Sequence, residues 1–170
     1  MRAILDRLYL VSGVLAATAL AAIAVLVLSQ TIGRLFGVLV PSANELAGYC
    51  VAASAFLGLA PTLNHGVHIR VRIVTQHLSA PVQRWLEGWC LLLGLGLSGF
   101  ATWYAIDLVV GSWRYGDVSP GLLAVPLWIP QLGMAAGLSI FTLSLLDNLL
   151  RLLRGREPLY REHESQEAGR

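Results

Sequence analysis

The histidines are the residues best suited to metal or haem chemistry, and all four lie outside the long apolar stretches of the chain. His65 and His68 are spaced like a pair of metal ligands, but residues 65–83 include no Cys, Asp or Glu to complete the coordination. His77 lies in the same loop and His163 near the C-terminus, so no histidine pair can hold a haem between apolar helices. The sequence therefore predicts no metal, haem or other cofactor.

The remaining reactive side chains form no recognisable catalytic set. Cys50 and Cys90 are expected near opposite faces of a membrane, too far apart for a disulfide, which needs Cα atoms within about 7 Å. No nucleophile with its base, phosphate-binding glycine loop or pair of catalytic carboxylates can be assembled from the polar residues. We therefore expect a protein that is not an enzyme.

Long apolar stretches dominate the chain, which is 56% hydrophobic and 13% charged, outside the usual balance of a soluble domain. Stretches without Asp, Glu, Arg or His are long enough to cross a hydrocarbon core of about 30 Å as helices. The sequence predicts an all-α integral membrane protein with four transmembrane helices in one domain (1–150), followed by a tail (151–170). The expected spans are 8–33, 46–64, 88–106 and 128–147.

The fourth and first spans each allow more than one interpretation. Pro120, Pro126 and Pro130 interrupt the start of the fourth stretch, so the regular helix is expected from Trp128, after a proline-rich segment at the membrane surface. The first stretch follows basic residues and can also be read as a cleaved signal peptide. Its unbroken length favours an uncleaved helix.

Arginine placement predicts the orientation. Only Arg34 and Arg114 lie on one side of the predicted spans, and the remaining ten of the 12 basic residues lie on the other side. Basic residues are retained in the cytoplasm, so both termini should be cytoplasmic. The net charge of +2 is small and lies at the membrane edges, which favours the lipid bilayer as a partner and not nucleic acid.

The predicted spans lack the groups that ion-coupled transport usually needs. Apart from Asp147 at the last position of the fourth span, they contain no Asp, Glu, Arg or His, which transporters commonly place near the bilayer centre. No inverted repeat or broken helix is apparent either. Although backbone and hydroxyl oxygens can bind Na⁺, this pattern argues against a transporter that acts alone.

Small residues indicate close helix packing. Gly133 and Gly137 form a Gly-x-x-x-Gly pair, and the second span is rich in Gly, Ala and Ser, so it should lie centrally against protein. Packing within the chain is favoured for such pairs, with association with another subunit as the alternative. Hydroxyl residues such as Ser12 are expected to bond to carbonyls one turn back on their own helix.

The loop between the second and third spans, residues 65–87, is short, basic and partly apolar. A helical projection places Val67, Val71, Val74 and Leu78 on one face, which suits a short amphipathic helix lying on the membrane surface. The alternation across 68–73 also permits an extended segment. Both interpretations stay open.

Three runs give the chain a family resemblance: Asn44-Glu45-Leu46-Ala47-Gly48-Tyr49, Gly66-Val67-His68-Ile69-Arg70-Val71, and Ser119-Pro120-Gly121-Leu122-Leu123-Ala124-Val125-Pro126-Leu127-Trp128-Ile129-Pro130-Gln131. In this order the chain resembles the small membrane (Q-type) subunit of tripartite ATP-independent periplasmic (TRAP) transporters over roughly residues 40–150. Two departures stand out: the family commonly has a basic residue at Asn64 and often an acidic one at Arg72.

The resemblance implies a subunit of a bacterial inner-membrane importer of organic acids such as carboxylates or sialic-acid-like solutes, driven by Na⁺. A periplasmic binding protein delivers the solute to a large membrane subunit that carries the substrate and ion sites. The small subunit is expected to be a multi-pass scaffold that supports the large subunit and the docking of the binding protein. The alternative is a four-span accessory or anchor subunit of a membrane redox complex.

Nine residues are candidates for the subunit interface. For some of them simpler roles compete: Glu45 can complement a helix N-terminus, Arg70 can anchor to lipid, and Trp128 can sit at the membrane interface. Asp107 is expected at the unfavourable C-terminal end of the third span, where it needs Arg34, Arg114 or another chain as a partner. The candidates are Glu45, His68, Arg70, Asp107, Ser119, Pro126, Trp128, Gly133 and Gly137.

Overall fold

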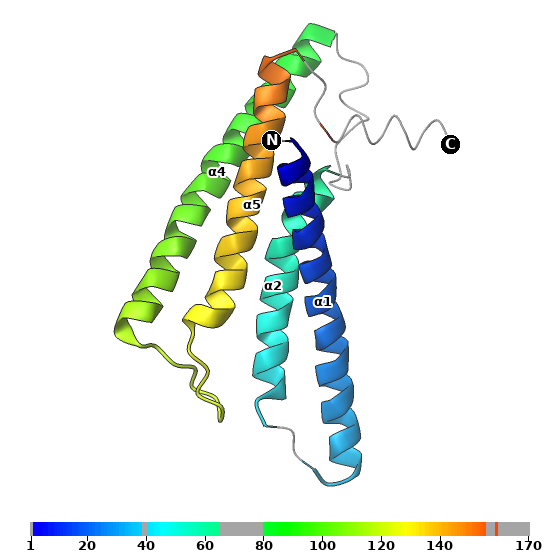
Figure 1. The fold of residues 1–170 in the computed structure, drawn as a ribbon, viewed down its shortest axis with the longest axis vertical. Coiled ribbons are helices and arrows are strands. Elements are labelled where there is room, and N and C mark those ends of the chain that lie inside the picture. Colours follow the sequence, from blue (N-terminus) through cyan, green and yellow to red (C-terminus); the bar gives the residue numbers. More distant parts are fainter. Residues whose placement is uncertain (1, 39–40, 65–79, 156–158, 160–170) are drawn as a thin grey trace, which may run out of the picture.

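Four helices make up the computed structural model, which describes residues 2–38, 41–64, 80–155 and 159 (Figure 1). All four are long and apolar enough to cross a membrane. The predicted all-α transmembrane fold is thus confirmed for this part of the chain. The helices are α1 (Arg2–Leu35), α2 (Ala43–Asn64), α4 (Ala80–Tyr115) and α5 (Trp128–Leu153).

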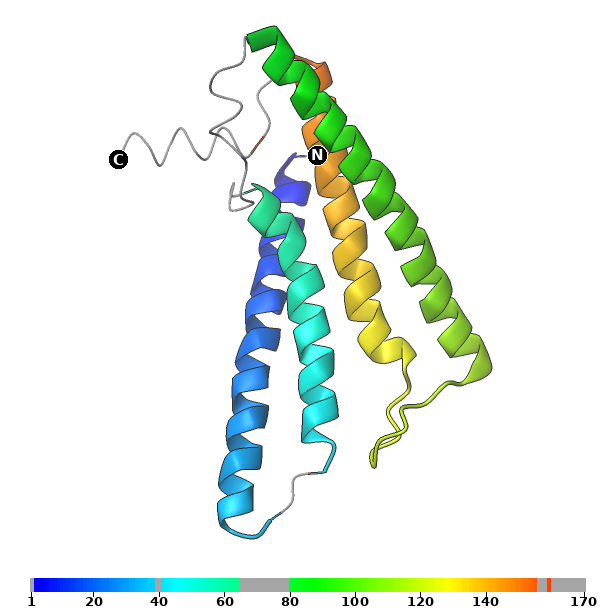
Figure 2. The ribbon, with the colours of Figure 1, turned by 180° about the vertical axis from the view of Figure 1, so that it is seen from behind.

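The helices form two hairpins that meet through their inner members. Helix α1 packs on α2, α4 packs on α5, and α2 packs on α5, so the order across the molecule is α4, α5, α2, α1 (Figures 1 and 2). Among residues in the most apolar part of each helix, 28% are buried in α5, 17% in α4, 11% in α2 and 6% in α1, and α2 is central because it packs against both α1 and α5. The expectation that the second span lies centrally is confirmed, and α5 shares that position.

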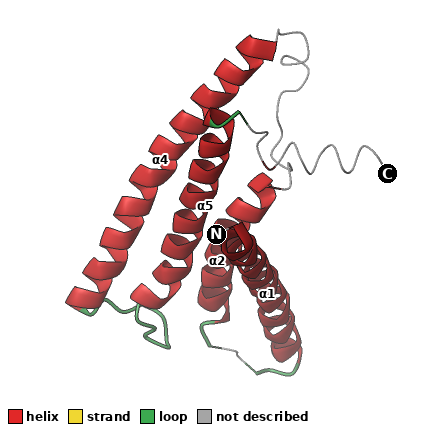
Figure 3. Cartoon of the chain, turned by 45° about the horizontal axis from the view of Figure 1, so that its top comes forward, coloured by secondary structure: helices red, strands yellow, loops and turns green. Residues whose placement is uncertain are grey.

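The two ends of the bundle differ in their connections. The N-terminus of α1 lies at the same end as the C-terminal end of α5, which we call the terminal end (Figure 3). The opposite end, called here the loop end, carries the connection from α1 to α2 and the connection from α4 to α5 (Figure 1).

Helix α4 is longer than the span expected at 88–106. It begins at Ala80 and continues to Tyr115, because charged residues at the membrane edge interrupt the apolar stretch without interrupting the helix. The helix ends just before Gly116, whose φ of +68° is a left-handed conformation that favours glycine. The predicted loop 65–87 therefore contributes its residues 80–87 to α4, and residues 65–79 lie outside the described part.

The proline-rich segment before α5 folds back on itself. The Ser119 backbone N–H donates to the Val125 carbonyl at 2.8 Å, and the Leu127 N–H donates to the Asp117 carbonyl at 3.0 Å. These bonds satisfy backbone groups in a segment that cannot be helical because of its prolines. The start of the regular helix at Trp128 is confirmed.

A hydrogen bond between helices compensates for the proline inside α2. Pro61 has no N–H to donate to the Leu57 carbonyl one turn back. The Ser12 hydroxyl of α1 donates to that carbonyl instead, at 2.5 Å, and Ser12 is fully buried. The expectation that Ser12 bonds to its own helix is therefore wrong, because the free carbonyl of α2 is within its reach.

We predict that Ser12→Ala destabilises the pairing of α1 with α2 by about 1 kcal/mol, because the Leu57 carbonyl loses its donor in a medium without water. Unfolding of the purified protein in mixed detergent micelles measures this. Thr18→Ala is the matched control, since the Thr18 hydroxyl donates to Val14 on its own helix. The additional change Pro61→Ala restores an N–H and should recover most of the loss; no recovery would contradict this explanation.

Candidate functional site

Two of the three family-like runs meet at the loop end of the bundle. Glu45 lies in the first turn of α2, and the Tyr49 hydroxyl one turn later donates to its Oε1 at 2.8 Å. A Cβ atom on Gly121 would overlap the same carboxylate, so any larger residue there would require the Glu45 side chain to move. Ser119 is buried and its Oγ accepts from the Gly121 N–H at 3.1 Å. We call these four residues the Glu45 cluster.

The Glu45 cluster ties the beginning of α2 to the connection between α4 and α5. The carboxylate complements the positive end of α2, as expected from its position in the sequence. It is only partly buried, so it can also meet a group from outside the chain. Among the described residues it belongs to no group of three or more His, Cys, Asp or Glu side chains that could hold a metal ion.

The two glycines of α5 lie against α2. A Cβ atom on Gly137 would lie 2.6 Å from the Phe56 carbonyl oxygen and 2.7 Å from the Leu57 nitrogen, which no real side chain could tolerate. A Cβ atom on Gly133 would lie 3.3 Å from the Cβ of Ala53. The contact made by this pair is within the chain, and its role at a subunit interface stays a prediction.

Other candidates lie where α4 and α5 approach the loop end. The Trp128 ring packs edge-on against Trp113 of α4, with ring centroids 4.9 Å apart. Pro126 pairs with Val118 in the folded-back segment. Deeper in the helix pair, the hydroxyls of Thr102 and Thr142 are hydrogen-bonded at 2.9 Å. These contacts give Trp128 and Pro126 roles within the chain, and their contact with another subunit stays a prediction.

Asp107 lies in the interior of α4 and not at its end. The helix continues for eight residues to Tyr115, about 12 Å along the axis, so the unfavourable helix-end dipole is not the relevant effect. Its side chain is exposed and forms no ion pair with Arg34, Arg114 or any other residue in the described ranges. It is therefore a charge on the outer face of a membrane-spanning helix.

The remaining candidates, His68 and Arg70, lie outside the described residues, as do the other three histidines. Among the residues that are described, no group of three or more His, Cys, Asp or Glu side chains could hold a metal ion.

A buried polar cluster at the terminal end was missed by the sequence reasoning. Asn64 at the end of α2 accepts two hydrogen bonds at its Oδ1, from Ser144 Oγ at 2.9 Å and from Asn148 Nδ2 at 3.1 Å. Asn148 also accepts from the Leu159 backbone N–H at 3.0 Å. Ser144 and Asn148 are fully buried. The cluster fastens α2 to α5 at this end of the bundle.

At the position of Asn64 the family resemblance described above implies a basic residue. A neutral amide can accept from both α5 side chains, whereas a basic residue could only donate. The spacing of Ser144 and Asn148, one turn apart on an apolar helix, is the sequence signal that could have indicated a polar contact there.

We predict that Gly137→Ala lowers stability by about 1 to 3 kcal/mol, because the added methyl group meets the backbone of α2 and forces the hairpins apart. Gly99→Ala on α4 is the matched control, since nothing lies within 4 Å of a Cβ atom there. Unfolding in mixed micelles compares the two variants. Equal stabilities would show that α2 and α5 do not approach this closely.

The comparisons with known proteins agree with this architecture. The family model described as "Tripartite ATP-independent periplasmic transporters, DctQ component" matches residues 23–155, well over half of the 170-residue chain. No curated protein sequence matches the chain. The match includes the Glu45 cluster, the glycine pair of α5 and the buried polar cluster up to Asn148. The chain therefore belongs to the DctQ family of small membrane subunits of TRAP transporters.

Proposed function

We propose that this chain is the scaffold subunit of a TRAP importer for organic acids in a bacterial inner membrane, and that it has no enzymatic activity of its own. It holds the large membrane subunit, which carries the substrate and Na⁺ sites, and it helps the periplasmic binding protein to dock. Family membership supports this role over the accessory subunit of a redox complex that the sequence alone left open.

The observation that carries the proposal is the exposed Asp107 carboxylate. A charged group on a membrane-spanning helix is costly unless it is paired or hydrated, and such groups commonly mark functional contacts. Large apolar side chains surround it on the exposed surface of α4, including Trp103, Tyr104 and Leu108. An unpaired carboxylate would be unfavourable on a helix surface that contacts only lipid. We infer that a basic or hydrogen-bond-donating group of the large subunit meets it.

The division between inner and outer helices supports the same role. α2 and α5 form the centre, and the outer faces of α1 and α4 present mostly apolar side chains. Their contact with lipid or with a second membrane protein requires no rearrangement of the centre. A rigid pair of hairpins of this kind can hold a moving partner in position.

The proposed topology assigns the Glu45 cluster to the binding protein. If both termini are cytoplasmic, the loop end faces the periplasm. The partly exposed Glu45 would then be available to a soluble receptor, while Tyr49 and Gly121 hold its side chain in place. A preorganised carboxylate loses less conformational entropy on contact than a mobile one.

We predict that Asp107→Asn reduces co-purification of the large subunit about five- to tenfold, because one polar contact in the membrane is lost. Asp107→Arg should abolish it. Asp117→Asn is the matched control, since Asp117 is exposed in the connection after α4. Uptake by proteoliposomes containing all three components should fall in parallel.

Two results would contradict the scaffold role. One is that all three variants co-purify equally with the large subunit. The other is that a cognate large subunit imports solute at its full rate when this chain is absent.

For receptor docking we predict that Glu45→Gln raises the binding-protein concentration needed for half-maximal uptake several-fold, with unchanged yield of the membrane complex. Tyr49→Phe is the comparison variant: it removes the internal hydrogen bond and leaves the carboxylate, so it should have a smaller effect than Glu45→Gln. Equal effects of the two changes would assign Glu45 an internal role only.

A further inference from the structure

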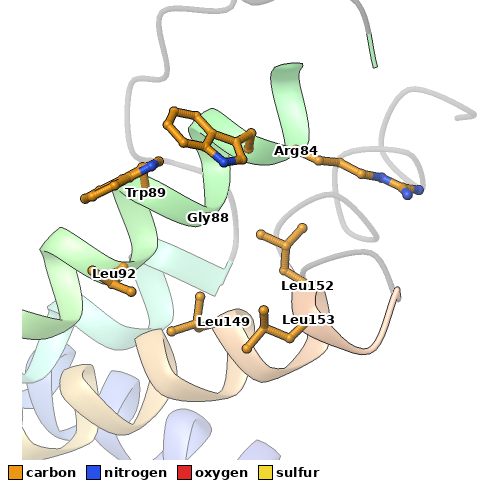
Figure 4. A pocket seen from close by; sticks show the side chains of 8 residues that line it. Arg84, Gly88, Trp89, Leu92, Leu149, Leu152 and Leu153 are labelled. Atoms are coloured by element: carbon orange, nitrogen blue, oxygen red, sulfur yellow. The ribbon is translucent and has the colours of Figure 1, made fainter. Parts of the chain in front are cut away.

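An open groove runs between the start of α4 and the end of α5, at the terminal end of the bundle. Its volume is about 830 Å³, and its α5 side is formed by Leu149, Leu152 and Leu153. Figure 4 shows these leucines facing the α4 side, where Trp89 and Leu92 lie, with Arg84 extending at the rim. Among the described residues, only those of α4 and α5 line this groove.

The α4 side of the groove has the composition of a membrane interface. Trp85 and Trp89 pack edge-to-face with ring centroids 5.7 Å apart, and both are exposed. Tryptophan favours the depth at which lipid headgroups meet the acyl chains. Gly88 lies between the two tryptophans in the sequence and lines the floor of the groove, where the absence of a side chain leaves the groove open.

Arg84 supplies a positive charge at the rim. Its side chain is exposed and forms no ion pair within the described ranges. Glu87, one turn later on α4, is buried, has interactions of its own and does not line the groove. The charge that the groove presents is therefore positive, and an anionic group is its complement.

We propose that this groove binds one anionic phospholipid. The phosphate lies at Arg84, the glycerol region lies beside Trp85 and Trp89, and an acyl chain runs along Leu92 and Leu149. A lipid matches the order of groups along the groove, from a cation through aromatic rings to leucines. This site depends on membrane residence and not on the proposed partnership with the large subunit.

The shape of the groove also favours an acyl chain over a protein helix. A Cβ atom on Gly88 would already lie 3.6 Å from the Leu152 Cδ2, so α4 and α5 almost touch along the floor. A helix is about 10 Å across and would rest on the rim without filling the groove. A hydrocarbon chain is narrow enough to enter it.

Native mass spectrometry of the delipidated full-length protein tests the proposal. Titration with phosphatidylglycerol should give one preferentially bound lipid, and phosphatidylcholine with the same acyl chains should bind more weakly. Arg84→Gln should weaken phosphatidylglycerol binding about fivefold, the effect of one basic residue near an anionic surface. Arg114→Gln, at the other end of α4, should leave it unchanged. Equal effects of the two substitutions would overturn the proposal.

A second pair of variants tests the groove without changing charge. Gly88→Leu should fill the floor and prevent binding of the preferred lipid, whereas Gly88→Ala adds only a methyl group at ordinary contact distance and should keep it. Preferred binding that survives Gly88→Leu would place the lipid elsewhere and overturn the assignment.

Crosslinking from the exposed Leu92 position can identify the molecule that occupies the groove in membranes. A photoreactive residue placed there should give lipid adducts in cells, both when the chain is alone and when it is expressed with the large subunit. Crosslinking to the large subunit in place of lipid would show that a protein covers the groove. That outcome would contradict the lipid site while supporting the proposed function.

Discussion

The backbone of α2 at Phe56 and Leu57 is the point on which the packing of this protein depends. Gly137 of α5 brings its backbone against the peptide unit between these two residues, and the Ser12 hydroxyl of α1 bonds to the carbonyl of the next unit, that of Leu57. Inside a bilayer the hydrophobic effect does not drive helices together, so close backbone contact and hydrogen bonds must do so. Pro61 creates the free carbonyl that makes the second contact possible.

With three helices joined at this point, the two ends of α2 become fixed against α5 and its preceding connection. At the terminal end Asn64 accepts from Ser144 and Asn148, and at the loop end Glu45 lies against Gly121. These polar contacts lie near the ends of a 22-residue helix, while the contacts between them are apolar and close. Helix α2 is therefore joined to its neighbours near both ends and in the middle. This arrangement suits a subunit whose proposed role is that of a rigid scaffold.

The outer helices can then serve other partners. Helix α4 has two features that the centre does not use: the exposed Asp107 toward the loop end, and the groove beside Arg84 toward the terminal end. The first is the proposed contact with the large subunit and the second is the proposed lipid site. Because they lie far apart along one helix, one face can meet protein near one membrane surface and lipid near the other.

The sequence by itself determined the four spans, the central position of the second, the start of the last at Trp128 and the family. Spans and family can be read directly because the hydrocarbon core restricts composition and the loop motifs are local. Only the tertiary structure decided that Ser12 bonds across to α2, that Asn148 is buried and that Asp107 is exposed within a helix. The physical reason is that a hydroxyl or amide can bond either to an acceptor on its own helix or to one on a neighbouring helix. Only the packing of the helices decides which acceptor it uses. A helix also continues past the end of its apolar stretch, so the charges at its edge cannot be placed from composition alone.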